Sequence, residues 1–378
     1  RVGTSEARGV TAMIDSARVP GAVIEGGVLQ HLGSPLGEQR ALAGGRAVAV
    51  LGDRRVLAVT GEDRLSWLDS LTSQALRTLE PGVSTELLVL DPQGRVEHAA
   101  AVLDDGETTW LLVDAGDADA LLIWLQRMRF RLRVELRDAG DEYTVVGGAS
   151  DAVAPWAASV DGRPLVWRDP WPDVAVGGWA YAATDPHPGG QRGWAEALVT
   201  SDRAEALVEA AARGEAALAG GIAADALRVA AWRPRWAAEV DGRLLPHEAD
   251  WLRTAVHLDK GCYRGQETVA KVHNLGHPPR RLVSLHLDGS DSVLPERGAA
   301  VRAGGDVVGE ITSAALHFED GPIALALVKR SAPVPGTLTV DSSAGDIAAA
   351  AETIVPPDAG RTAAVPRMPR LGRRTAAG

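Results

Sequence analysis

Cysteine and lysine are both scarce in this sequence. Cys262 is the only cysteine among 378 residues. The chain by itself therefore forms no internal disulfide, no four-cysteine zinc site and no iron–sulfur cluster held by its own thiolates. A reducing, cytoplasmic setting is expected. Lysine occurs only at Lys260, Lys271 and Lys329, and the first two flank Cys262.

Long apolar runs and an excess of basic charge are also missing. No apolar run reaches the roughly 18 residues that a membrane-spanning helix needs, and the first residues lack the order of a secretory signal. The formal net charge of −11 argues against a protein that coats nucleic acids, which needs a dominant basic face. We therefore expect neither a membrane nor a directly bound nucleic acid as a partner.

Several chemical motifs are absent as well. The chain has no glycine-rich nucleotide loop, no H-E-x-x-H pair and no G-x-S-x-G elbow. The polar run from His247 to Asp250 matches no common spacing of metal ligands. No permanently bound metal is expected.

The length and a hydrophobic content of 46% predict a multidomain α+β protein. We expect mixed antiparallel α/β domains around a central cavity. The predicted parts are a flexible N-terminal arm (1–44), a discontinuous domain (45–144 and 225–279), an inserted α+β module (145–224), a small C-terminal β-barrel (280–355) and a disordered basic tail (356–378).

Local patterns predict individual elements. Apolar residues at helical spacing predict helices over 62–76 and 117–128, and a helix over 200–214 is expected to have a capping box of Asp202 and Glu205. Strict alternation over 127–137 predicts a strand with Arg127, Arg129, Arg131 and Arg133 on one face. That face either attracts an anionic ligand or is simply exposed to solvent. The second interpretation is favoured, because arginines are mostly found at the protein surface.

The segment from Leu258 to His273 is the most informative, since it places Cys262 between Lys260 and Arg264. A nearby cation favours thiolate over thiol, which makes the sulfur a better nucleophile or soft-metal ligand. Gln266 and Glu267 stand where a following helix would begin. A lone cysteine is nevertheless more often a small buried hydrophobe.

Residues 260–267 match the pattern K-G-C-Y-x-G-Q-E, which resembles the signature of the YgfZ family of folate-binding proteins. The strand and helix around 56–74, the helix carrying Arg228 and the C-terminal β segment resemble the same family, so the likeness spans roughly residues 45–355. The resemblance implies a tetrahydrofolate-type ligand, bound by the domain of 45–144 and 225–279. It also implies a role in iron–sulfur cluster assembly or repair, which supports cluster-dependent enzymes including those of tRNA modification.

The resemblance implies that the fold is shared with the T-protein of the glycine cleavage system, a tetrahydrofolate-dependent aminomethyltransferase. The paired aspartates that support catalysis there are replaced here by Glu97 and His98. This weakens the transferase reading, although Glu97 would substitute if it faced the cavity. Whether the chain is an enzyme is left open.

The resemblance and the chemistry of the motif together give a set of candidate residues. Cys262 and Lys260 are the candidates for chemistry. The family's carboxylate after the helical arginine is missing, and Glu248 is the proposed replacement that accepts N–H bonds from a pterin edge; a surface loop is the equal alternative. Further ligand-binding candidates are Tyr263, Arg264, Gln266, Glu267, Arg228 and Arg131, the last for the glutamate tail of folate.

Three functions stay open at this point. The first is a folate-dependent accessory protein whose partners are cluster assembly proteins or cluster-containing enzymes, with Cys262 as the working thiol and transient or shared cluster ligation. The second is a one-carbon or aminomethyl transferase. The third is a scaffold in which the motif is structural. A monomer is expected in each case.

Overall fold

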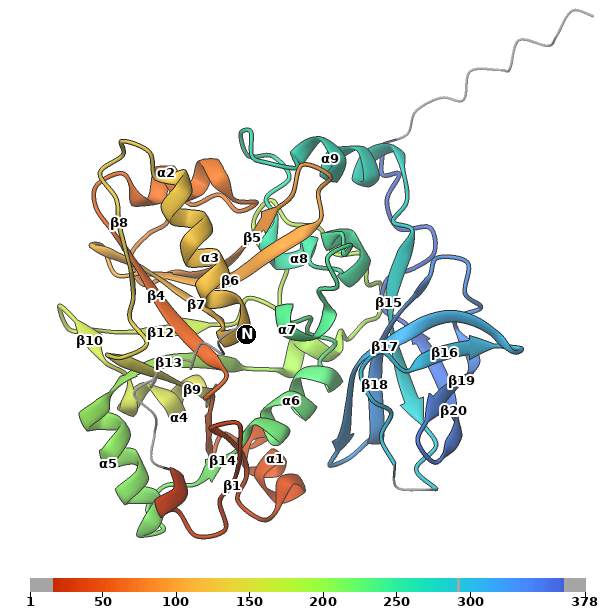
Figure 1. Ribbon diagram of the computed structural model, residues 1–378, viewed down its shortest axis with the longest axis horizontal. Helices are drawn as coiled ribbons and strands as arrows, with labels where there is room; N and C mark the ends of the chain where they lie inside the picture. The colour runs from red at the N-terminus through yellow and green to blue at the C-terminus, as the bar shows by residue number, and fades with distance from the viewer. Residues whose placement is uncertain (1–15, 291–292, 364–378) are drawn as a thin grey trace, which may run out of the picture.

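Three sheets organise the chain (Figure 1). The computed structural model describes residues 16–290 and 293–363. Two five-stranded sheets lie on one side of the molecule and a closed barrel on the other. The sequence-derived expectation of an α+β fold with a C-terminal barrel is confirmed.

The first sheet has the order β5-β6-β7-β4-β8, with every neighbouring pair antiparallel. Its strands are β4 (Arg54–Thr60), β5 (Ser84–Leu90), β6 (Val96–Asp104), β7 (Thr108–Asp114) and β8 (Glu135–Asp138). Helices α2 (Arg64–Leu71) and α3 (Ala115–Met128) cover one face. Alternation along β6 sends Ala100 and Val102 toward these helices and Ala101 and Leu103 to the opposite face.

The second sheet faces the first and has the order β12-β13-β9-β3-β14. Its strands are β3 (Val48–Val50), β9 (Tyr143–Ala149), β12 (Val166–Arg168), β13 (Trp194–Thr200) and β14 (Leu218–Ala219). Ala101 and Leu103 of the first sheet share a core with Leu51, Trp167 and Leu198. Because β3 joins this sheet, the module expected at 145–224 is completed by a strand from the earlier segment.

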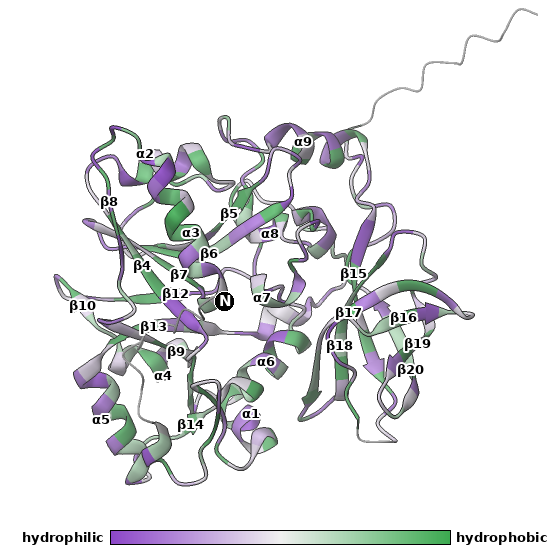
Figure 2. Cartoon of the chain, in the orientation of Figure 1, coloured by the Kyte–Doolittle hydropathy of each residue, from purple (hydrophilic) through white to green (hydrophobic). Residues whose placement is uncertain are grey.

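Short elements border the second sheet. They are η1 (Ser16–Arg18), β1 (Val23–Glu25), β2 (Val28–His31), α1 (Pro35–Ala43), α4 (Ser150–Val153), η2 (Ala154–Trp156), β10 (Ser159–Val160), β11 (Arg163–Pro164), η3 (Pro188–Gln191), α5 (Ser201–Ala212) and α6 (Gly221–Ala230). Hydrophilic and hydrophobic residues mix along α5 (Figure 2), whose buried stripe includes Leu207 and Val208.

The barrel has the closed order β15-β18-β17-β16-β19-β20, all antiparallel. Its strands are β15 (Arg280–Leu287), β16 (Ala300–Ala303), β17 (Asp306–His317), β18 (Gly321–Lys329), β19 (Gly336–Ser342) and β20 (Gly345–Thr353). Between barrel and sheets lie α7 (Trp236–Glu239), η4 (Pro246–Ala249), α8 (Leu252–Ala255) and α9 (Gln266–Leu275). No helix of the described residues is long and apolar enough to cross a membrane.

The terminal segments differ from the sequence prediction. Residues 16–44 are not a loose arm, because Leu29 and Leu42 are buried and Glu38 accepts hydrogen bonds from the backbone of Leu32 and Gly220. At the other end, Thr362 bonds to the carbonyl of His273 at 3.0 Å, so the predicted tail is ordered as far as 363. Residues 1–15 and 364–378 lie outside the described ranges.

The strand predicted over 127–137 is also wrong for most of its length. Helix α3 continues to Met128, and pairing with β4 begins only at Glu135. Phe130, which the alternation puts on the face opposite the arginines, is 89% exposed and has a φ of 50°. Ion pairs from Arg133 to Glu62 and Asp63 fix the loop in between, so the apolar alternation never meets a second strand.

The helix predicted over 200–214 is confirmed as α5, but its predicted cap is not. α5 starts at Ser201, and its N-cap, Thr200, makes no side-chain hydrogen bond to the helix. The end is as expected, because Gly214 takes a φ of 73° just beyond the last helical residue.

Candidate functional site

A cavity of about 100 Å³ lies between the two sheets and the segment that follows α6. Its walls combine small apolar residues of β6, aromatic residues and charged side chains. They include Asp53, Arg54, Glu86, Ala99, Ala100, Ala101, Asp114, Trp167, Asp169, Arg192, Trp194, Glu196, Asp225, Arg228, Arg233, Arg235, Trp236 and Trp251. The expected central cavity is therefore present, although Arg228 is the one charged residue of its lining that the sequence analysis selected.

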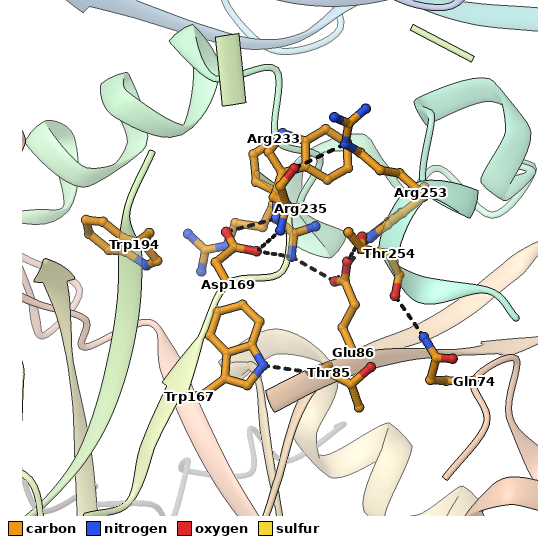
Figure 3. A network of polar contacts seen from close by, with 12 residues as sticks. Gln74, Thr85, Glu86, Trp167, Asp169, Trp194, Arg233, Arg235, Arg253 and Thr254 are labelled. Atoms are coloured by element: carbon orange, nitrogen blue, oxygen red, sulfur yellow. Dashed lines mark hydrogen bonds and ion pairs between the residues drawn. The ribbon is translucent and has the colours of Figure 1, made fainter. Parts of the chain in front are cut away.

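Arg233 is the centre of one ion-pair network in this cavity (Figure 3). Its guanidinium lies 2.8 Å from Glu86 and 3.1 Å from Asp169. Arg192 also pairs with Asp169, and the hydroxyl of Thr254 donates to Glu86. Two buried carboxylates and two arginines are thereby held in one arrangement.

Burial and ion pairing shift the pKa values of the groups in this network in opposite directions. Burial alone would raise the pKa of Asp169, but Arg233 and Arg192 hold that pKa below its usual range. Burial lowers the pKa of Arg192 to about 10 in spite of Asp169. Both groups are thus charged near neutral pH.

A second network shares the cavity wall. Arg54 bonds to Glu196 at 2.9 Å and to Asp114 at 3.3 Å. Arg235 lies 2.6 Å from Asp114 and 2.7 Å from Asp53. Burial would raise the pKa of Asp114, and Arg235 and Arg54 together lower it.

Two buried donors in the cavity remain unused by the described residues. They are Nε of Arg192 and Nη1 of Arg233. Buried polar atoms in native proteins nearly always have partners, so such donors mark a place where a ligand acceptor or water fits. On the acceptor side, Glu196 Oε1 accepts one long hydrogen bond, from Trp194 Nε1 at 3.4 Å, which leaves it room for a second donor.

The candidates of the second hairpin do not line the cavity. Glu97 forms an ion pair with Arg264 at 2.6 Å, and His98 Nδ1 lies 2.6 Å from Asp117. The β6 residues that line the cavity are Ala99, Ala100 and Ala101, and of these Ala100 turns its side chain toward α2 and α3. The strand therefore offers the cavity no carboxylate, and Glu97 does not substitute for one.

Lys260 and Cys262 occupy very different environments. Lys260 donates to the carbonyls of Thr72 at 2.8 Å and Gln74 at 2.7 Å, and also to that of Asp69. Its side chain is 4% exposed, and burial lowers its pKa. Cys262 is exposed. The two cations expected to activate the thiol are thus engaged elsewhere, Lys260 by backbone carbonyls and Arg264 by Glu97.

Tyr263, Gln266 and Glu267 follow the thiol at the start of α9. Tyr263 is buried with the Lys260 ammonium 5.4 Å from its ring centre. Gln266 donates to the carbonyl of Lys260 at 3.3 Å, and Glu267 is exposed in the first turn of α9. The predicted helix start is confirmed, but none of these residues reaches the central cavity.

Glu248 is placed elsewhere than the sequence analysis expected. It is fully buried, and its carboxylate accepts hydrogen bonds from the backbone of Leu245 at 3.0 Å and from the Arg280 guanidinium at 2.9 Å. Arg280 N also donates to it at 3.0 Å. Glu248 thus joins η4 to β15 and does not line the cavity, so its position does not suit a pterin acceptor.

The two candidate arginines also differ from expectation. Arg228 lines the cavity, but its guanidinium is used by Asp225 at 2.6 Å, Glu239 at 3.2 Å and Ser313 at 2.7 Å. It ties α6 to the barrel. Arg131 is exposed in the loop after α3, and none of the four alternating arginines borders the cavity.

The sequence carried a weak signal for the residues that were missed. Glu196 interrupts the apolar strand 194–200. A carboxylate buried in a strand is costly unless a positively charged or hydrogen-bonding side chain pairs with it. Glu86 interrupts β5 in the same way. Metal ligation finds no support in the described ranges, where no three His, Cys, Asp or Glu side chains gather around a common point.

Known proteins resemble the chain at several levels. Residues 280–357 match the family described as the glycine cleavage T-protein C-terminal barrel domain. An aminomethyltransferase of Streptomyces coelicolor is 28% identical over 292 residues, which is 74% of this chain and 77% of the relative. The mouse iron–sulfur cluster assembly factor IBA57 is 33% identical over 127 residues, 32% of this chain and 33% of that protein.

The fold has a solved counterpart. The glycine cleavage system aminomethyltransferase T from Bartonella henselae superposes with a TM-score of 0.69 at 16% identity, covering 90% of this chain and 95% of that one. That likeness concerns the fold alone. By sequence, the chain is similar to aminomethyltransferases over most of its length and to IBA57 cluster assembly factors over a shorter part.

Proposed function

We propose that the chain binds a reduced folate in the central cavity and assists iron–sulfur cluster assembly without catalysing aminomethyl transfer. The observation that carries this proposal is the β6 wall. Where the T-protein resemblance implies a carboxylate, Ala99, Ala100 and Ala101 line the cavity, and Glu97 and His98 are paired outside it.

The cavity lining suits the chemistry of a pterin ring. A pterin presents N–H donors beside its 2-amino group and an acceptor at its 4-oxo group. Glu196 has an oxygen available to receive such donors, and the unused N–H groups of Arg192 and Arg233 suit an acceptor. These three residues are our candidates for holding the ring.

The size of the cavity adds a requirement. A cavity of 150 Å³ holds benzene, and a bicyclic ring needs more than the 100 Å³ between these walls. Entry of a folate ring therefore requires some of the long arginine side chains to move aside. The rest of the ligand extends beyond the cavity.

Cys262 suits the accessory role because it is exposed on the surface. A partner protein can reach it there, whereas the cavity lining holds no thiol. One thiolate supplies one ligand, so a cluster would be shared with the partner and not resident on this chain. The YgfZ-like motif at 260–267 supports the same role.

Anaerobic calorimetry with tetrahydrofolate tests the binding site. We expect micromolar binding by the native chain and by Cys262→Ala, and at least a tenfold loss in Glu196→Gln. Glu107→Gln, on an exposed turn, is the matched control and should bind normally. Absence of binding by the native chain, or full affinity in Glu196→Gln, would overturn the site.

Aminomethyl transfer is the second candidate, and the relatives favour it, since the aminomethyltransferase of Streptomyces avermitilis also matches 75% of the chain at 28% identity. Incubation with tetrahydrofolate and an aminomethyl-loaded lipoyl protein distinguishes the two functions. Ammonia release at rates typical of an enzyme would establish the transferase. No release, together with loss of cluster-dependent enzyme activity in cells carrying Cys262→Ala, is the result we expect.

A further inference from the structure

A second pocket, of about 270 Å³, lies beside the motif that contains Cys262. Its walls come from the loop at 177–179, from 258–266 and from α9. No residue lines both this pocket and the central cavity. It is therefore a separate site within the described part of the chain.

Backbone geometry specific to glycine builds the pocket. Gly177 has a φ of 74°, and a Cβ there would lie 2.5 Å from the ring of His257. Gly265, with a φ of 83°, turns the chain into α9. The helix then presents Gln266, Ala270 and His273 to the pocket at the three- and four-residue spacing of one helix face.

Two buried side chains end in polar atoms that no described residue satisfies. Tyr263 is 8% exposed and His273 is 7% exposed, and both line the pocket. His273 Nδ1 lies 2.9 Å from the Tyr181 hydroxyl, which fixes the ring and leaves Nε2 without a partner among the residues that the structure describes. The Tyr263 hydroxyl likewise makes no hydrogen bond to the described residues, so both atoms are available to a ligand.

The charge of the lining restricts the ligand. Asp259 contributes a carboxylate, and the lining includes no lysine or arginine. Lys260 is directed to the carbonyls at the end of α2. Burial lowers the pKa of His273, so its imidazole is neutral. Phosphates and carboxylates therefore find no counter-charge here.

An aromatic wall favours a flat ligand. Trp179 is 43% exposed and packs edge-on against His273, with 5.1 Å between the ring centres. Exposed tryptophan faces stack well on planar rings. Gln266 adds an amide whose N–H bonds to Lys260 and whose oxygen is left for a ligand donor.

We propose that this pocket is a second small-molecule site, which takes an uncharged planar nitrogen heterocycle of about nucleobase size beside the Cys262 thiol. Cys262 directly precedes Tyr263 and is exposed. The assignment does not depend on folate binding in the central cavity.

Disulfide capture at Cys262 tests the proposal, because the chain has no other cysteine to react. Two symmetric disulfides serve as probes, one carrying adenine on an ethyl linker and one carrying cyclohexyl on the same linker. In the exchange, the Cys262 thiolate attacks the probe, one S–S bond forms as another breaks, and one probe thiolate leaves. Mass spectrometry measures the captured fraction at a fixed concentration of 2-mercaptoethanol.

We expect the adenine probe to reach half-capture at a concentration at least tenfold lower than the cyclohexyl probe. Trp179→Ala, a change at an exposed side chain, should abolish the preference, and His273→Gln should reduce it. Glu196→Gln and saturating tetrahydrofolate should leave it unchanged. Equal capture of both probes, a preference that survives Trp179→Ala, or competition by tetrahydrofolate would overturn the proposal of a second site.

Discussion

Arg264 and Glu97 form an ion pair of 2.6 Å that joins the loop carrying Cys262 to the start of β6. The loop also packs against the turn before β6, where a Cβ on Gly265 would lie 2.5 Å from the carbonyl of Asp91. The position of the thiol is thus set by the hairpin that, in the transferase reading, would carry catalytic carboxylates.

Breaking this ion pair should loosen the loop without unfolding the protein. Both side chains are 35% exposed, so Glu97→Gln should lower the free energy of unfolding by less than about 1 kcal/mol. Hydrogen exchange of residues 258–265 should become faster. Glu142→Gln breaks the exposed Glu142–Arg137 pair and is the control. Unchanged exchange around Cys262 would show that packing alone holds the loop.

Lys260 should contribute to stability more than to chemistry. Lys260→Met leaves the carbonyls of Asp69, Thr72 and Gln74 without their shared donor. We expect the free energy of unfolding to fall by about 2–3 kcal/mol in urea titrations. Lys271→Met, on the exposed side of α9, should change it little. Full stability combined with lost function in Lys260→Met would instead assign the ammonium a direct role.

Much of the fold is visible in the sequence because its elements have clear local periodicity. The helix predicted over 117–128 corresponds to α3, and the run of short strands after 280 closes into the barrel. The alternation at 127–137 gave a wrong prediction of a strand because its first residues belong to the end of a helix. Whether Phe130 meets a neighbouring strand is decided by β4, which pairs only from Glu135 onward.

The candidate site was less predictable than the fold because it depends on contacts between residues that are far apart in the sequence. A short motif can be read directly, and the sequence located Cys262. The cavity instead joins Glu86, Asp169 and Arg233, which are far apart along the chain, and a single sequence carries no information on that contact. The same limit explains why the position of Glu248 was predicted wrongly, because its ion-pair partner Arg280 is the first residue of the barrel.

Replacing Phe130 with asparagine should increase the stability of the protein. Its φ of 50° is in the left-handed region, which costs an ordinary residue about 1–2 kcal/mol and which asparagine tolerates better. Phe130→Asn should therefore raise the free energy of unfolding by about 1 kcal/mol, since the exposed ring contributes little packing. Phe130→Ala keeps the backbone cost and should not show this gain. Equal stability of the two variants would remove backbone strain as the cause.

The pair of Asp241 and Arg280 should make stability depend on acidity below about pH 4. Burial would raise the pKa of Asp241, but hydrogen bonds from Arg280 and from the backbone of Arg243 lower it to about 2. A carboxyl with a lowered folded pKa stabilises the protein above its unfolded pKa, near 4, and this contribution is lost as the pH falls toward 2. Asp241→Asn should therefore lower the free energy of unfolding by about 2 kcal/mol at pH 7.

Urea titrations from pH 7 to pH 3 measure this effect. The difference in the free energy of unfolding between Asp241→Asn and the native chain should become smaller below about pH 4. A difference that stays constant across this range would show that the contribution of Asp241 comes from its shape or neutral hydrogen bonds, and not from its charge.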